Sequence, residues 1–461
     1  MPSPSINVGA TNPVVSVKTQ AELRAKGKRL REKCPRSSHG SWKAPTGRRD
    51  AVDLIEEANM GRLPELVPIR HGRMMLSPFT FYRGTALNMA ADLATTPTTG
   101  IHVQVCGDAH LGNFRLFGTP ERRMIFDIHD LDETLPAPWE WDVKRLAASF
   151  VVASRNNNLS EQTAREAVLD CVRSYREHMA EFSSMNVLDV WYASFQAETL
   201  IKNFRSKRHR KHLAKRLSKV RERSALEHDF PKLTSGGKDP KIREHPPTIY
   251  HGRKTEYLCR KTYYDYRDTL PPYRRGLLDR FDIRDFAIKV VGVGSVGTAC
   301  FVVLLMAGAK DPLFLQVKEA RASVLEPYAG ASIFPNNGQR VIMGHRLMQS
   351  SSDIFLGWTL GKTGRHYYVR QLRNEKIKFE VDRFDAPHMI QFAERCGATL
   401  ARAHARTGEP ATISGYLGKS DKFDRAIADF SIAYADQAER DYESFMKAIR
   451  KGRLEALAQE K

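Results

Sequence analysis

Two short polar segments carry the residue types that phosphoryl transfer needs. In residues 106–113 (CGDAHLGN), Asn113 follows Asp108 by five positions, and residues 126–133 (FDIHDLDE) form a second acidic cluster. An Asp near the end of a strand can orient an acceptor hydroxyl and accept its proton. An Asn and a second Asp, brought close by a hairpin, can hold Mg²⁺ with oxygen ligands. The types and spacing of these residues therefore indicate phosphoryl-transfer chemistry.

Short strands and helices are expected to position both segments. Residues 101–106 predict a strand that leads into the first segment, and residues 113–117 and 123–128 predict a hairpin that ends in the second. Asp142 is expected to cap a following helix, and a second helix is expected to begin near Asn158. The hairpin would bring the two polar segments together.

Four runs of sequence resemble known families. The pattern G-D-x-H-x-x-N, followed 14 residues later by an apolar-apolar-Asp, resembles the catalytic and metal loops of aminoglycoside-phosphotransferase-like kinases. The chain more specifically resembles DUF2252, a bacterial family of unknown function, over about residues 50–450. The runs that carry this resemblance are FTFYRG (79–84), GDAHLGNF (107–114), FDIHDLDET (126–134) and PWEWDVKRLAAS (138–149).

The kinase resemblance implies a role for each matching residue. Asp108 would be the catalytic Asp, and His110 would brace its loop. Asn113 and Asp127 would be the Mg²⁺ ligands, and Asp142 would be the structural Asp that opens the next helix. Cys-Gly precedes the catalytic Asp here, where a protein kinase would have His-Arg, and this departure argues against protein substrates.

A glycine-rich run later in the chain predicts a phosphate contact. Gly292, Gly294, Ser295 and Gly297 lie in the run GVGSVG between two β-rich segments, as in a hairpin that covers phosphates. Backbone amides approach phosphates closely where side chains are absent. The following strand ends in QVK, and Lys318 resembles the kinase lysine that contacts the α- and β-phosphates.

The partner of that lysine and the surrounding elements can also be proposed. Glu319 or Glu326 could pair with Lys318, and Glu326 is preferred because it lies further into the next helix. Residues 367–372 resemble a strand that runs into a hinge. Residues 396–404 resemble the helix that normally precedes a G-D-x-H loop.

Simpler interpretations exist for each of these features. The glycine run also fits a Rossmann strand-turn-helix that binds a dinucleotide, or a plain turn, although the β-rich residues 300–305 favour a hairpin. Asp108 and Asn113 could form an Asx turn. Asp130 could replace Asp127 as the metal ligand, or be a solvated acid. Arg83 could hold a phosphate or bridge two helices through a carboxylate.

Two metal-centre interpretations are weaker. A binuclear metallophosphoesterase also uses Gly-Asp elements, but its initial D-x-H, ahead of the Gly-Asp, and its G-N-H element are missing. A zinc site could be imagined from four residues near the first strand, yet their spacing matches no zinc signature. Those residues are His102, Cys106, His110 and His129.

The order of the motifs predicts an unusual architecture. The fold class expected is α+β, kinase-like and two-lobed, with a circular permutation, because the glycine run follows the Asp108 segment instead of preceding it. Permutation is tolerated where termini lie close together on a surface. The regions expected are a basic, mostly disordered tail (1–50) with one short helix near Ala21–Lys33, a helical catalytic lobe (51–280), a β-rich nucleotide lobe (281–385) and C-terminal helices that pack on the catalytic lobe (386–461).

Within the β-rich region, an antiparallel sheet is expected because β-branched and apolar residues dominate. The strands expected there are 287–293, 298–306, 312–318, 339–348 and 366–372, with a short helix at 320–328. Helical periodicity returns from Met389 to the end of the chain.

The 461-residue chain is strongly basic, with a net charge of +20. Residues 1–50 hold 11 Lys/Arg and 3 Asp/Glu, and residues 202–223 hold 11 Lys/Arg and one Glu. The remaining chain is close to neutral. A solvated basic helix is preferred for 202–223, and a weak electrostatic contact of both segments with RNA or an anionic surface is the alternative.

Composition limits the protein class in other ways. Hydrophobic residues are 41% and charged residues 27%, which is ordinary for a globular protein. The six cysteines are scattered, and no signal peptide or transmembrane segment is predicted, so a cytoplasmic, bacterial protein with reduced thiols is expected.

The function expected is an ATP- and Mg²⁺-dependent phosphotransferase acting on a small hydroxyl-bearing molecule. One alternative is a non-catalytic nucleotide-binding module with a degenerate kinase-like site. A Rossmann-type dinucleotide enzyme is the other.

Overall fold

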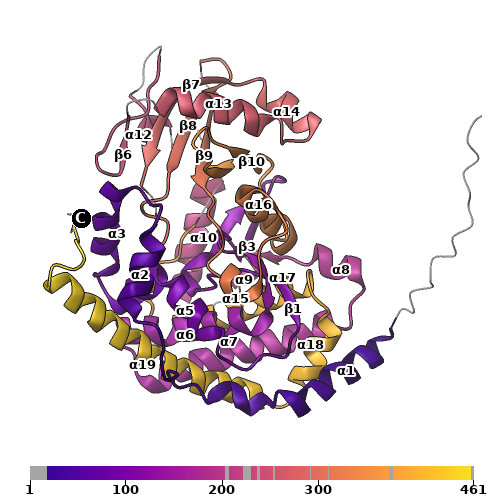
Figure 1. Cartoon of the computed structure of the whole chain (residues 1–461). Helices are drawn as coiled ribbons and strands as arrows, with labels where there is room; N and C mark the ends of the chain where they lie inside the picture. The colour runs from indigo at the N-terminus through magenta and orange to yellow at the C-terminus, as the bar shows by residue number, and fades with distance from the viewer. Residues whose placement is uncertain are drawn as a thin grey trace, which may run out of the picture.

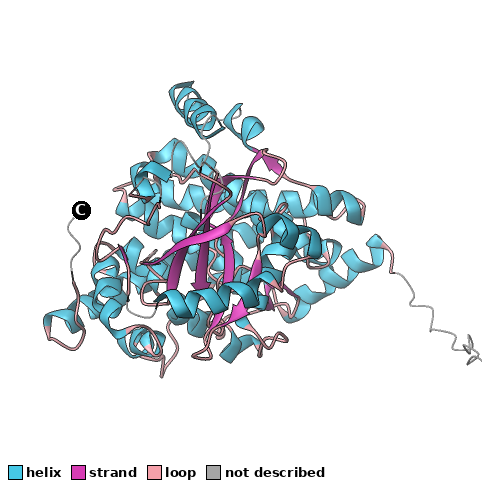
Figure 2. Cartoon of the chain, turned by 90° about the horizontal axis from the view of Figure 1, so that it is seen from above, coloured by secondary structure: helices cyan, strands magenta, loops and turns pink. Residues whose placement is uncertain are grey.

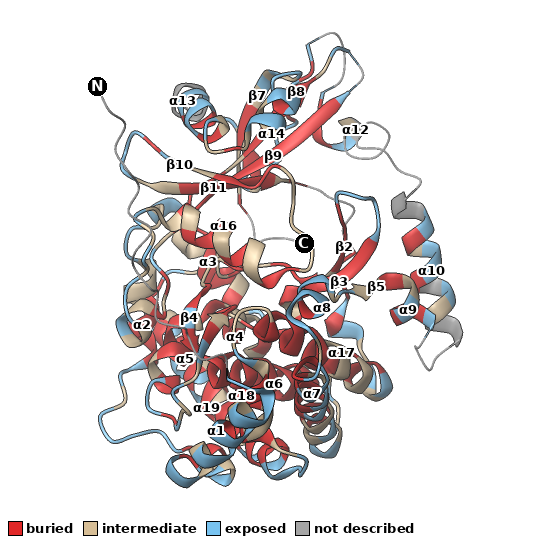
Figure 3. Ribbon diagram, turned by 90° about the vertical axis from the view of Figure 1, so that its right-hand side faces the viewer, coloured by how far each residue is buried: buried red, intermediate tan, exposed pale blue. Residues whose placement is uncertain are grey.

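The computed structural model describes residues 18–202, 207–221, 230–235, 239–252, 255–290, 292–309, 311–372 and 377–457. It confirms a mixed α+β chain (Figure 2). A six-stranded sheet lies at one end of the molecule and a group of packed helices at the other, with two small sheets between them (Figure 3).

The described part of the amino-terminal segment is packed, so it is more ordered than predicted, and the short helix predicted near Ala21–Lys33 is confirmed. Helix α1 (Gln20–Lys33) packs against α18 (Pro410–Leu417) near the carboxyl end of the chain (Figure 1). Gly27 is buried in this contact, and a Cβ there would lie 1.9 Å from the carbonyl oxygen of Thr412. Close helix packing therefore depends on a residue that has no side chain. Residues 1–17 lie outside the described residues.

Four long helices form the main core. These are α6 (Trp139–Asn156), α7 (Glu161–Phe182), α17 (Ala386–Ala405) and α19 (Lys422–Arg450). Trp139 and Tyr175 stack in this core with ring centroids 5.6 Å apart. The helical periodicity predicted from Met389 onward is confirmed.

The starts of α6 and α7 differ from the prediction. Helix α6 begins at Trp139, so Asp142 lies within its first turn instead of capping it. Helix α7 begins at Glu161 because the Ser160 side chain accepts a hydrogen bond from the Thr163 amide. Asn158 has a φ of +56°, which is incompatible with a helix start at that residue.

The first two predicted strand regions are confirmed. Strand β1 (His102–Val105) pairs antiparallel with β4 (Leu135–Pro138). The hairpin of β2 (Phe114–Gly118) and β3 (Met124–Ile128) is extended by β5 (Phe195–Gln196).

The β-rich region forms an antiparallel sheet with the order β10-β11-β9-β8-β7-β6. Its strands are β6 (Ile249–Tyr250), β7 (Asp282–Lys289), β8 (Cys300–Met306), β9 (Pro312–Glu319), β10 (Gly357–Leu360) and β11 (His366–Gln371). One predicted strand is wrong, because residues 337–348 form helix α16 (Asn337–Met348), capped by the Asn336 side chain. The helix predicted at 320–328 is limited to α15 (Glu326–Ala329).

The basic segment around residue 210 contains helix α10 (Lys207–Arg221). It is not a freely solvated helix, because Leu213 and Leu217 are buried and Arg216 donates a hydrogen bond to the carbonyl oxygen of Lys378. The predicted contact with RNA or an anionic surface stays a prediction.

Shorter elements connect these parts. They are η1 (Arg36–Gly40), α2 (Ala51–Asn59), η2 (Pro64–Leu66), α3 (Val67–Met74), α4 (Pro78–Gly84), α5 (Ala86–Leu93), η3 (Leu111–Asn113), α8 (Val187–Tyr192), α9 (Ala197–Lys202), α12 (Phe230–Leu233), α13 (Thr255–Arg267), α14 (Pro272–Leu278) and η4 (Val381–Arg383). Among the helices that the structure describes, none is long and apolar enough to cross a membrane.

Candidate functional site

A cavity of about 340 Å³ lies where three predicted segments meet. These segments are the Asp108 loop (residues 106–113), the acidic turn (residues 129–133) and the glycine loop (residues 292–297). The predicted site residues that line the cavity are Arg83, Asp108, His110, Asn113, Asp130, Gly292, Gly294 and Ser295. The predicted site residues that do not line the cavity are Asp127, Asp142, Gly297, Lys318 and Glu326.

The Asp108 loop is held by a buried carboxylate. Asp142 accepts hydrogen bonds from the amides of Cys106 (2.6 Å) and Gly107 (2.9 Å). His404 on α17 lies 3.2 Å from the same carboxylate. Gly107 has a φ of +80°, and a Cβ there would lie 2.3 Å from the carbonyl oxygen of Glu133. The loop geometry therefore requires both the glycine and the carboxylate.

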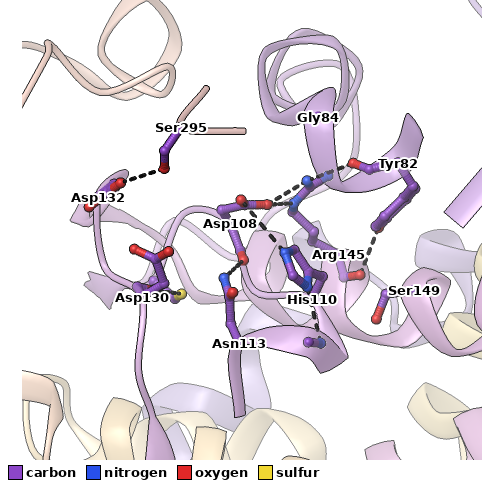
Figure 4. A network of polar contacts seen from close by, with 12 residues as sticks. Tyr82, Gly84, Asp108, His110, Asn113, Asp130, Asp132, Arg145, Ser149 and Ser295 are labelled. Atoms are coloured by element: carbon purple, nitrogen blue, oxygen red, sulfur yellow. Dashed lines mark hydrogen bonds and ion pairs between the residues drawn. The ribbon is translucent and has the colours of Figure 1, made fainter. Parts of the chain in front are cut away.

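Asp108 lies between a buried arginine and a histidine (Figure 4). Arg145 Nε donates to Asp108 Oδ1 at 2.7 Å, and His110 Nε2 lies 3.9 Å from Oδ2. Burial raises the pKa of Asp108 to about 6, against the opposing effect of Arg145. A carboxylate with a pKa close to neutrality suits a general base.

His110 braces the loop in its neutral form. Its Nδ1 accepts a hydrogen bond from the Gly112 amide at 3.1 Å, so the ring proton belongs on Nε2, facing Asp108. Burial lowers the pKa of His110 well below its usual range, and Arg83 and Arg145 lower it further. The ring is therefore a poor base itself.

Asn113 connects the loop to the cavity. Its Nδ2 donates to the carbonyl oxygen of Asp108 at 2.8 Å (Figure 4). The side chain thereby holds the backbone at Asp108, and the residue lines the cavity next to it.

Asp127 is not at the cavity, which overturns its assignment as a metal ligand. The residue is fully buried, and its Oδ1 lies 2.5 Å from the Arg402 guanidinium. Its Oδ2 accepts hydrogen bonds from the amide and the hydroxyl of Ser350, both at 2.8 Å. On β3 this side chain points toward α17 and the end of α16, so both oxygens are already engaged.

Asp130 lies beside the Asp108 loop instead. Its side chain is 32% exposed at the cavity, its Oδ1 lies 3.6 Å from Lys318 Nζ, and that oxygen accepts no hydrogen bond. Burial raises the pKa of this carboxyl, but Lys318, Arg370 and Arg115 together bring it below its usual range. Asp130 is therefore an ionised carboxylate with spare ligand capacity.

The glycine loop closes the cavity from the side of the six-stranded sheet. It joins β7 to β8 as an antiparallel hairpin, so the Rossmann strand-turn-helix interpretation does not fit. Ser295 Oγ donates to Asp132 at 3.3 Å, which ties the loop to the acidic turn. The backbone is anchored by Arg73, which donates to the carbonyl oxygen of Gly292, and by the Leu63 amide, which donates to that of Gly297.

Lys318 pairs with the acidic turn and not with the predicted Glu326. Its ammonium contacts Asp132 and lies 3.6 Å from Asp130. Burial lowers the pKa of Lys318, but these two carboxylates raise it above its usual value. Glu326 instead accepts a hydrogen bond from the Ser323 amide at 3.1 Å.

Several residues at or beside the cavity were not predicted as site residues. Arg145 contacts Asp108 without lining the cavity, and its place three residues after Asp142 on a helix was the available indication. The others, which do line the cavity, are Glu57, Arg62, Arg115 and Arg321. These come from distant parts of the chain and carry no local motif.

Within the described ranges, no cluster of three His, Cys, Asp or Glu side chains is arranged to hold a metal ion. Mg²⁺ needs fewer protein ligands than such a cluster provides, since it is commonly bound by one or two carboxylates together with water and substrate phosphates.

The sequence of the chain matches a recognised family. The chain belongs to DUF2252, described as an uncharacterized protein conserved in bacteria, and the family model matches residues 62–448. No curated protein and no solved structure matches the chain.

Proposed function

We propose that this protein is an ATP- and Mg²⁺-dependent phosphotransferase whose acceptor is a small hydroxyl-bearing molecule. The observation that supports this most is that Asp108, Asn113, Asp130 and the glycine loop line one cavity. A single nucleotide could therefore touch the glycine loop while its terminal phosphate faces Asp108.

A permuted kinase-like arrangement is part of this proposal. Helix α17 follows the six-stranded sheet in sequence, yet its Arg402 and His404 contact Asp127 and Asp142 around the Asp108 loop. In the kinases that the sequence resembles, the corresponding helix comes directly before that loop. The contacts of α17 support a chain order in which the nucleotide half follows the catalytic half.

The residues at the cavity fit Mg²⁺ held jointly with phosphate. Asp130 and Asn113 would hold the ion, which would neutralise charge on the phosphates when bound. The Oδ1 of Asp130 accepts no hydrogen bond and lies 3.6 Å from Lys318 Nζ, so Mg²⁺ would share this carboxylate with the lysine. Lys318 would contribute positive charge near the nucleotide from its position beside Asp130 and Asp132.

The proposed chemical step requires only a few groups of the protein. Asp108 orients the acceptor hydroxyl and takes its proton as the oxygen attacks the γ-phosphorus. The bond between the γ-phosphorus and the β,γ-bridging oxygen breaks, and ADP leaves. Arg145 keeps the carboxylate in place, and His110 fixes the loop, so most of the rate would come from positioning and electrostatics.

Titration calorimetry of the full chain with ATP and MgCl₂ tests this proposal. We expect ATP binding that weakens without Mg²⁺, and no binding of NADPH. ADP release in the presence of a library of small hydroxyl compounds should be lost in Asp108→Asn and kept in Asp282→Asn, a control at an exposed carboxylate.

The outcomes separate the alternatives. Failure of ATP to bind with Mg²⁺ would refute the phosphotransferase proposal. Tight ATP binding, with no ADP release by the wild type or by Asp108→Asn, would instead support a non-catalytic nucleotide-binding module.

A further inference from the structure

We propose that Arg83 and Arg115 bind an anionic group of the acceptor, so that the substrate is a hydroxyl compound that also carries a carboxylate or a phosphate. The inference rests on the phosphotransferase proposal for the role of the cavity. The existence of an anion site at these two arginines can be tested separately.

Both arginines reach the cavity from the same side as the Asp108 loop. Arg83 is in the last turn of α4, and its Nε lies 3.6 Å from the position that a Cβ of Gly112 would take. Arg115 is on β2, two residues after Asn113. The two side chains therefore border the space in which an acceptor hydroxyl would meet Asp108.

Neither guanidinium forms a direct ion pair with a residue that the structure describes, although the carboxylates of Asp108 and Asp130 lie near enough to raise the pKa of one or both arginines. The Nε atoms of Arg83 and Arg115 are buried and make no hydrogen bond. Two charges beside the cavity are matched: Arg145 pairs with Asp108, and Lys318 pairs with Asp132. Arg62 and Arg321 line the cavity too, but their guanidinium groups donate to backbone carbonyl oxygens. A buried, unpaired cation is costly, so two such groups at one cavity indicate a site for an anion.

The charges around the pair are mixed. Burial lowers the pKa of both arginines, whereas Asp108 and Asp130 raise the pKa of Arg83 and Asp130 raises that of Arg115. The positive charges of Arg370 and Arg83 lower the pKa of Arg115 further. The charges of Arg83 and Arg115 also lower the pKa of Lys378, so a third cation lies near the pair. A bound anion would relieve this repulsion.

The acceptor is a better occupant than the nucleotide. The groups assigned to the nucleotide, which are the glycine loop and Lys318, come from the six-stranded sheet. Arg83 and Arg115 come from a helix and a hairpin next to the Asp108 loop. The planar fork of a guanidinium matches the paired oxygens of a carboxylate or a phosphate, and it would orient the acceptor for attack.

Binding of inorganic phosphate and of acetate to the full chain tests the inference. Each anion is titrated with and without a saturating non-hydrolysable ATP analogue and Mg²⁺, for the wild type, Arg83→Gln and Arg115→Gln. Arg165→Gln is the matched control, because Arg165 forms a surface ion pair with Asp429 away from the cavity. Arg115→Lys keeps the charge without the planar fork, and it covers the case in which a Gln variant does not fold.

We expect one of the two anions to bind with the analogue present, and its Kd to rise about tenfold or more in each Gln variant. Arg115→Lys should show a smaller rise, and Arg165→Gln none. Which anion binds would identify the acidic group of the acceptor.

Three results would overturn the inference: no binding of either anion, displacement of the anion by the analogue, or unchanged anion binding in the Arg83 and Arg115 variants. If the analogue does not bind at all, the phosphotransferase proposal fails. The titrations without analogue would then still show whether the two arginines form an anion site.

Discussion

The contrast between Asp127 and Asp130 gives the sharpest test of how the site is built. Asp127 is fully buried, and its carboxylate is the charged partner of the fully buried Arg402. The Nε and Nη1 atoms of Arg402 make no hydrogen bond. Changing Asp127→Asn would therefore leave a buried guanidinium without charge compensation.

The size of the effect follows from that geometry. Breaking a buried ion pair by removing one partner costs about 3–5 kcal/mol. Asp130→Asn should cost at most about 1 kcal/mol, because Lys318 retains Asp132 as its partner. The free energy of unfolding of both variants can be measured by urea denaturation, and Mg²⁺-dependent ATP binding by calorimetry.

We expect one variant to lose stability and the other to lose the Mg²⁺ dependence of ATP binding. Asp127→Asn should be strongly destabilised but, where folded, should still bind ATP with Mg²⁺. Asp130→Asn should be stable and should lose the Mg²⁺ dependence of ATP binding. Wild-type stability of Asp127→Asn together with loss of its Mg²⁺ response would refute the reasoning and return the ligand role to Asp127.

Three further outcomes are expected. Because the pKa of Asp108 is raised to about 6, its basic form is lost below that pH, so kcat/KM should fall about tenfold per pH unit below pH 6 in a pH–rate profile. Asp142→Ala leaves two loop amides without an acceptor and should lower the free energy of unfolding by about 1–3 kcal/mol and reduce ADP release; unchanged turnover would contradict its positioning role. Gly27→Ala places a Cβ against Thr412 and should make α1 sensitive to limited proteolysis, whereas Lys28→Ala, at an exposed position of the same helix, should not.

Much of the local structure around the site could be predicted from the sequence. The hairpin of β2 and β3, the strand before Asp108 and the antiparallel strands around the glycine loop all follow from runs of β-branched and apolar residues bounded by turn residues. The strand predicted at 339–348 was wrong, because an Asn336 cap and a buried helical face outweigh local β-propensity.

The amino-acid sequence by itself determined which residue types were available and where the loops form. It placed Asp108, Asn113 and the glycine loop at chain turns, since these patterns act over a few neighbouring residues. Membership in DUF2252 is likewise carried by such local runs.

Only the tertiary structure decided which basic residue each carboxylate faces. Asp127 and Asp130 lie three residues apart, yet one faces Arg402 on α17 and the other faces Lys318 on β9. Such partners come from segments about 190 to 275 residues away in sequence. The direction of a side chain and the charge that meets it depend on packing between distant elements, and no local pattern encodes that packing.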